Sequence, residues 1–114
     1  MATVKQADVA WSAHASEPKA NGKATVTITG PDGVTMGESG SRAGKATHVV
    51  VRESNPEVSG SAYWLERSGH PYGYSIHGTP DSAQKAYENA QSERHRQTGE
   101  LMHANSWLVP VERG

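Results

Sequence analysis

The chain has 114 residues, a formal net charge of −1 and 34% hydrophobic residues, which is the material of one domain with a loose arm. Ten valines, three leucines, two isoleucines and no phenylalanine predict a thin core, although the balanced charge argues against disorder. Zero cysteines exclude disulfides, thiolate metal sites and a cysteine nucleophile. The near-neutral charge also removes the broad electrostatic footprint of a nucleic-acid-binding protein.

Neither the hydropathy along the chain nor its polar first residues indicate a membrane-spanning segment or a signal for export. No apolar run is long enough to span a bilayer, and the first residues lack the apolar stretch of a signal peptide. We therefore expect a cytoplasmic protein without a membrane partner.

The first 36 residues predict an N-terminal β-hairpin arm (1–36). Ala7, Val9 and Trp11 would share one face of a first strand, and over 24–29 apolar residues alternate strictly with threonines. This period of two is typical of a half-buried strand. Turn residues at 30–33 then lead to a return strand over 34–36.

A glycine- and serine-rich segment, 37–46, follows the arm. Residues 37–45 contain three glycines and two serines with no large apolar side chain, which is typical of a mobile linker. The segment resembles a phosphate-binding loop superficially. The spacer between Gly40 and Gly44 is one residue too short, however, and Ala46 stands where the loop needs a hydroxyl.

The remaining residues, 47–114, predict a β-β-β-α-β domain. Three segments, 47–53, 62–67 and 72–77, have the composition of strands and are expected to form an antiparallel meander. The β-branched run Val49–Val51 suits a central strand that is covered on both faces.

A strong helix start follows the meander. Thr79 offers a capping hydroxyl, Pro80 occupies the first helical position and Asp81 faces the positive end of the helix dipole. The helix is expected to end near Gln97, with Gly99 as its stop. Its narrow apolar stripe consists of Ala83, Ala86, Tyr87 and Ala90. Pro110 then predicts that the last segment is an edge strand, which completes an α+β fold.

Catalytic and metal-binding motifs are absent from the sequence. The six histidines are not spaced as metal ligands usually are in a sequence motif. Only His77 follows the end of a predicted strand. No Gly-x-Ser-x-Gly nucleophile motif occurs, and Glu53, Glu57 and Glu66 have no evident partner. We therefore expect no cofactor, no metal and no enzymatic activity.

Aromatic residues crowd two predicted strands. Tyr63 and Trp64 are neighbours and so point to opposite faces of a strand, which means that both cannot fill one core. Outward aromatic side chains are typical of interfaces, while cover of Trp64 by the linker or the arm is the alternative. The interface candidates are Trp64, Tyr72, Tyr74 and Trp107.

Residues 47–105 resemble a short bacterial domain of unknown function. The resemblance rests on His48-Val-Val, on Trp64, on the helix that begins at Thr79, and on Gly99-Glu-Leu101 after it. That family combines strands, an alanine-rich helix with a Thr or Asp cap, and a Gly-Glu-Leu strand. Because it has no established activity, the resemblance implies a fold and no mechanism.

Two further resemblances imply functions. Residues 70–79 and 104–110 are similar to segments of phage tail-completion proteins, which implies a virion-associated structural role, although the long helices of those proteins have no counterpart here. Three strands followed by a helix also resemble the arm-type DNA-binding domain of phage integrases. Lys45, Arg52 and Arg67 would then contact DNA.

The sequence thus favours a non-enzymatic module for protein binding or self-assembly, of the kind that phage structural and host-interaction proteins represent. A thin core gains stability when a partner, or a second copy in a homo-oligomer, covers part of the sheet. DNA binding through the three-stranded sheet is the alternative.

Overall fold

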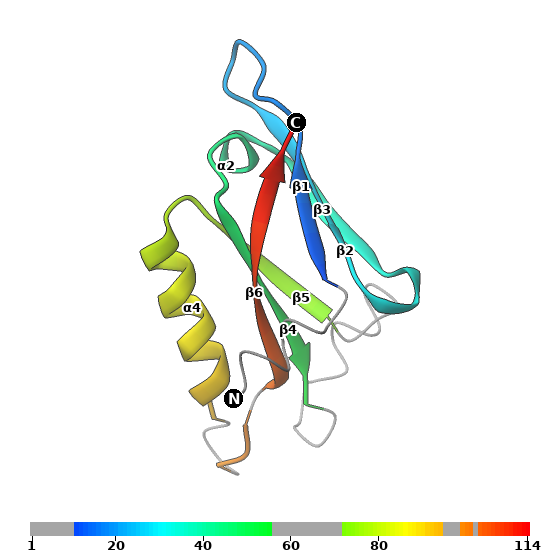
Figure 1. The fold of residues 1–114 in the computed structure, drawn as a ribbon. Helices are drawn as coiled ribbons and strands as arrows, with labels where there is room; N and C mark the ends of the chain where they lie inside the picture. Colours follow the sequence, from blue (N-terminus) through cyan, green and yellow to red (C-terminus); the bar gives the residue numbers. More distant parts are fainter. Residues whose placement is uncertain (1–10, 56–71, 95–98, 102) are drawn as a thin grey trace.

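A computed structural model of the chain describes residues 11–55, 72–94, 99–101 and 103–114. Six strands form one mixed sheet in the order β3-β2-β1-β6-β4-β5, and one long helix lies against it (Figure 1). The fold is therefore α+β and mostly strand, as predicted. In chain order the elements are β1 (Ser12–Ala15), β2 (Ala24–Thr29), the 3-10 helix η1 (Pro31–Gly33), β3 (Thr35–Gly40), the short helix α2 (Ser41–Gly44), β4 (His48–Ser54), β5 (Tyr72–His77), α4 (Pro80–Ser92) and β6 (His103–Arg113).

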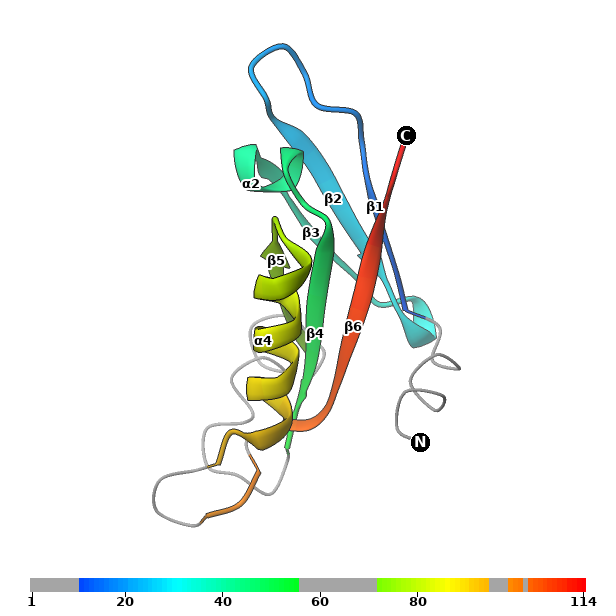
Figure 2. The same ribbon diagram turned by 60° about the vertical axis from the view of Figure 1, so that its left-hand side comes forward.

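The sheet curls into a half-barrel, with α4 on the outside of β4 and β6 (Figure 2). Inward-facing side chains of β1, β2, β4, β5 and β6 share one hydrophobic cluster. A second, smaller cluster joins Val50 and Leu108 of the sheet to Ala83, Ala86 and Tyr87 of α4. Val49, Val50 and Val51 are all fully buried, which confirms that this run forms a central strand covered on both faces.

Strand β2 has the predicted bounds, and its residues alternate between buried and exposed positions as predicted. It pairs antiparallel with β3, which continues to Gly40. On its other side β2 pairs with β1, whose first residue is Ser12. The predicted first strand therefore falls mainly on residues outside the described part of the chain.

The prediction of a structureless linker over 37–46 is wrong. Gly37–Gly40 belong to β3, and Ser41–Gly44 form α2. Ala43 and Ala46 are buried in the main cluster, so two methyl groups anchor a segment whose composition suggested mobility. Pairing of β1 with β6 also joins the predicted arm to the predicted domain in one sheet.

The expected order of the meander is also wrong. Strand β4 pairs directly with β5 on one side and with β6 on the other, so residues 62–67 do not separate the first and last strands of the predicted meander. Residues 62–67 themselves lie outside the described residues. Since β6 completes the pairing of β4, β5 is the outer strand of this half of the sheet among the described residues.

The predicted start of the helix is confirmed. Thr79 has extended backbone angles, and its Oγ1 accepts a hydrogen bond from the Ser82 amide at 3.1 Å. The predicted end near Gln97 is wrong, because Glu93 already has extended geometry and Arg94 forms a β-bridge with Leu101. Neither this helix nor the short α2 has the length and apolar character that a membrane-spanning segment needs.

The predicted C-terminal edge strand is instead a central strand, because β6 lies between β1 and β4. Pro110 is tolerated there for a local reason. The Val111 amide donates to the Thr47 carbonyl at 2.9 Å, so the neighbouring Pro110 nitrogen points away from β4. The parallel pairing with β1 starts only at Val111, beyond the residue that lacks a donor.

Candidate functional site

Three aromatic rings pack against one another inside the half-barrel. Trp11 meets Tyr72 edge-on with ring centroids 5.0 Å apart, and its centroid lies 5.5 Å from that of Trp107. Tyr72 and Trp107 are 6.2 Å apart. Trp107 is only 9% exposed, while Tyr72 is half-buried. Of the interface candidates, Trp107 therefore packs within the chain's own core, and Trp64 lies outside the described residues.

A side-chain contact between Tyr74 and Glu38 connects β5 and β3, the last and first strands in the order of the sheet. The Tyr74 hydroxyl on β5 donates to Glu38 Oε1 on β3 at 3.1 Å, and Glu38 is exposed. Burial raises the pKa of Tyr74 to about 12, and the hydrogen bond to the Glu38 carboxylate and its charge act in the same direction. Two strands that are farthest apart in the sheet are thus linked by side chains.

We call the open side of the half-barrel the seam, defined by Met36 and Glu38 on β3 and by Tyr72 and Tyr74 on β5. Met36, Tyr72 and Tyr74 are partly buried and pack against the main cluster from this side. Within the described part of the chain, neither β3 nor β5 has a second strand as neighbour. Apolar, aromatic and carboxylate groups therefore border the two outer strands of the described sheet at one place.

The basic candidates for DNA contact are not brought together in the described structure. Lys45 is exposed beside α2, whereas Arg52 lies near the far end of β4 and is half-buried. Arg52 Nη1 donates to Ser75 Oγ at 3.2 Å, and burial lowers the pKa of Arg52. Arg67 lies outside the described residues. DNA contact by these three side chains stays a prediction.

A polar network surrounds His77 on the outer face of β5. Its Nδ1 lies 2.8 Å from Ser82 Oγ in the first turn of α4, and its Nε2 lies 2.7 Å from Ser75 Oγ. Ser75 in turn accepts from Arg52. The network ties the N-terminus of α4 to the sheet. In the sequence, this network is indicated only by the position of His77 at the end of a predicted strand.

The network holds the His77 ring between Ser75 of the sheet and Ser82 of α4. A histidine that acts as a general base must become an imidazolium. Burial lowers the pKa of His77, and the positive charges of Arg52 and Arg42 and the neighbouring His48 lower it further. The same surroundings that hold the ring in place therefore oppose the charged form that base catalysis needs.

The lowered pKa of His77 predicts a loss of stability in acid. The folded state binds the proton less readily than the unfolded chain, whose histidines titrate near about 6.5. The free energy of unfolding should therefore be fully retained above this pH and fall as the pH drops towards the folded pKa. Denaturant unfolding between about pH 7.5 and about pH 5 measures the effect.

Two variants isolate the contribution of His77. His77→Gln should reduce the dependence of stability on pH, whereas Gln84→Ala, which changes an exposed side chain of α4 that does not titrate, should leave it unchanged. Equal pH dependence in His77→Gln and the unmodified protein would contradict this prediction.

Some contributors to these sites carried weak signals in the sequence. The sequence predicts that Trp11 shares one face of a first strand with Ala7 and Val9, but it contains no signal for the ring partners of Trp11. Glu38 fell in the supposed linker, and Ser75 and Ser82 showed no motif. No group of three or more metal-ligating side chains is found among the residues that the structure describes.

Comparison of the chain with protein-family models, with curated proteins and with solved structures gives no match.

Proposed function

We propose that this protein is a non-enzymatic module for protein binding or self-assembly and that the seam is its binding surface. The observation that carries the proposal is the bond between Tyr74 and Glu38, which brings β3 and β5, the two outer strands of the sheet as far as the structure describes it, within side-chain reach of each other. Free strand edges are templates for pairing with another chain.

The pairing directions support binding of an extended segment at the seam. Strands β3 and β5 run in the same direction, because the intervening pairs are antiparallel except for β1 with β6. A single strand that enters the seam can therefore be antiparallel to both edges, which is the more stable pairing.

The side chains at the seam support a protein partner over a nucleic acid. Tyr72 and Tyr74 present large, rigid surfaces that lose little conformational freedom on contact. Glu38 adds negative charge, which opposes phosphate groups. The resemblance to phage tail-completion proteins points to the same class of function, since such proteins act by assembly.

Self-assembly is the form of binding that we favour, because the thin core gains stability from a second copy. Size-exclusion chromatography with light scattering should show an oligomer at micromolar concentration. Tyr74→Arg should weaken the association by about tenfold, because it removes a ring and places a charge at the seam.

The matched control adds the same charge elsewhere. Gln84→Arg, on the exposed side of α4, should leave the oligomeric state unchanged. A heat-stable monomer at all accessible concentrations, or equal weakening by both variants, would argue against assembly through the seam.

A further inference from the structure

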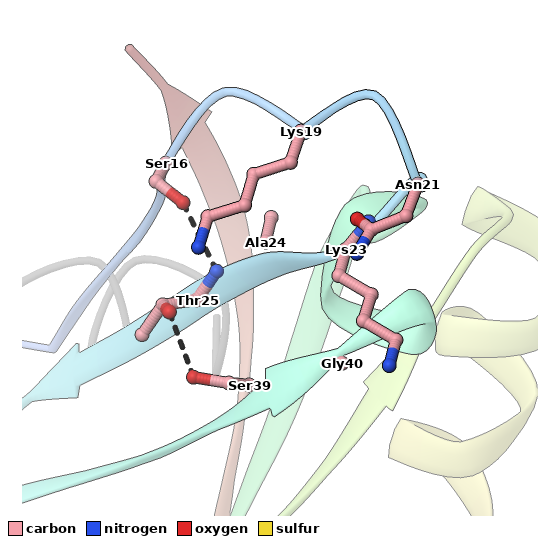
Figure 3. A pocket seen from close by; sticks show the side chains of 8 residues that line it. All are labelled: Ser16, Lys19, Asn21, Lys23, Ala24, Thr25, Ser39 and Gly40. Atoms are coloured by element: carbon pink, nitrogen blue, oxygen red, sulfur yellow. Dashed lines mark hydrogen bonds between the residues drawn. The ribbon is translucent and has the colours of Figure 1, made fainter.

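A polar groove of about 300 Å³ lies just beyond the seam residue Glu38, where the loop between β1 and β2 passes the end of β3 (Figure 3). Figure 3 shows the Lys19 side chain running back from the loop towards Ser16, while the Lys23 ammonium group lies towards Gly40. The residues that line the groove are Ser16, Lys19, Asn21, Lys23, Ala24, Thr25, Ser39 and Gly40.

A tight turn fixes the two lysines at the groove. The Lys19 amide donates to the Lys23 carbonyl, and the Gly22 amide donates to the Lys19 carbonyl, both at 2.8 Å. Gly22 has a φ of 82°, a conformation that glycine adopts without strain. Asn21 Oδ1 accepts from the Lys23 amide at 3.0 Å, which closes the loop. The turn therefore fixes the backbone of Lys19 and of Lys23 before any ligand binds.

The lining side chains have mainly hydrogen-bond donors left to offer. Ser16 Oγ already accepts from the Thr25 amide at 3.0 Å, and Thr25 Oγ1 and Ser39 Oγ share a bond of 2.7 Å. The Ser16 hydroxyl hydrogen and one hydroxyl hydrogen of the Thr25–Ser39 pair remain to donate, as do both ammonium groups. No carboxylate lines the groove. Such a site suits a ligand that only accepts hydrogen bonds.

Further positive charge lies beside the groove. Arg113 Nη1 donates to the Ser16 carbonyl at 3.2 Å, and its Nη2 binds the Gly44 and Ala46 carbonyls at 2.9 Å. Glu17 follows Ser16 in the loop and Glu112 precedes Arg113, and both are exposed to solvent. Among the described residues, neither Lys19 nor Lys23 takes part in an ion pair.

We propose that this groove binds a phosphate monoester dianion. Two lysines match its two negative charges, and the hydroxyls can donate to its remaining oxygens. A phosphodiester carries one charge and is the weaker match. The groove shares none of the four residues that define the seam, so a failure of this proposal would leave the proposed function untouched.

Titration with inorganic phosphate, followed by amide chemical shifts of the labelled protein, tests the proposal. We expect saturable shifts at Ser16, Thr25, Ser39 and Gly40, and competition by a nucleoside monophosphate. Lys19→Gln and Lys23→Gln should each weaken phosphate binding by about tenfold. Lys85→Gln, which removes an exposed lysine from α4, should leave it unchanged.

Several results would overturn the site. Chloride at matched ionic strength could produce the same shifts, or all three variants could lose affinity equally, and either result would mean general screening. Tighter binding of a short oligonucleotide than of the monophosphate would assign the groove to phosphodiesters instead. A well-dispersed spectrum of each lysine variant shows that a loss of binding does not come from unfolding.

Discussion

Replacement of Trp107 by alanine is expected to lower the free energy of unfolding by about 3–5 kcal/mol. Trp107 lies opposite Val51 on β4, is 9% exposed and contacts the rings of Trp11 and Tyr72. The substitution removes the largest side chain of a core that otherwise consists mainly of valine and alanine. Few neighbouring atoms can move into the space, because most neighbours are held in the sheet.

Denaturant unfolding monitored by far-ultraviolet circular dichroism measures this loss without relying on tryptophan fluorescence. Since a domain of this size is stable by only about 5–15 kcal/mol, the variant should unfold at a much lower denaturant concentration. Trp107→Phe keeps one ring in place and should cost no more than about 1–2 kcal/mol. Equal and small losses in both variants would mean that Trp107 is not packed as described.

The substitution Gly37→Ala is expected to destabilise the protein by about 3 kcal/mol. Gly37 lies on β3 opposite Thr27, and a Cβ atom added there would collide with the Val26 carbonyl oxygen. That oxygen belongs to the backbone of Val26 on β2. Because the Val26 side chain is fully buried, this part of the backbone cannot move without disturbing the core. Relief would require β3 to separate from β2. Thermal and denaturant unfolding both measure the cost.

Gly78→Ala provides the matched control. A Cβ atom at Gly78 would lie 3.5 Å from the Lys45 carbonyl oxygen, which is an ordinary contact, and Gly78 is exposed. This variant should stay within about 0.5 kcal/mol of the unmodified protein. Equal stability of the two alanine variants would contradict the close approach of β3 to β2. The comparison matters for the proposed function because β3 is one of the two seam edges.

Short-range patterns predicted the elements whose residues act on their close neighbours in the chain. Strict alternation located β2 at Ala24–Thr29, and the hydroxyl of Thr79 located the start of α4 through its bond to the Ser82 amide. Both signals operate over two to four residues, and the surrounding fold reinforces them. The burial of Ala83, Tyr87 and Ala90 followed from the same helical spacing.

Predictions failed where distant parts of the chain compete with local preference. Glu93 leaves the helix and its Oε1 lies 3.2 Å from His103 Nε2, while Arg94 bridges to Leu101. Both contacts are with residues at or just before the start of β6. The helix α4 therefore ends at Ser92, although its sequence favours a helix up to Gln97. Composition likewise marked 37–46 as a linker, because the burial of Ala43 becomes visible only when α2 packs against β2.

The residues of the seam also depend on contacts between distant parts of the chain, which local sequence patterns do not predict. The sequence marked Tyr72 and Tyr74 as interface candidates, but it did not indicate that Glu38 is the partner of Tyr74 or that Trp107 contacts Trp11. No sequence motif marks the two lysines of the polar groove, because their backbones come together only through the turn at Asn21 and Gly22.

By itself the sequence determined where β2, β4, β5 and the start of α4 lie, because hydrogen-bonding caps and side-chain periodicity act within a few residues. The order of the strands was decided only in the tertiary structure. Pairing of Ala13 with Val111 joins opposite ends of the chain, places β6 at the centre of the sheet and leaves β3 and β5 as its edges. Such pairings depend on how all inward side chains fill one shared core, which no local pattern specifies.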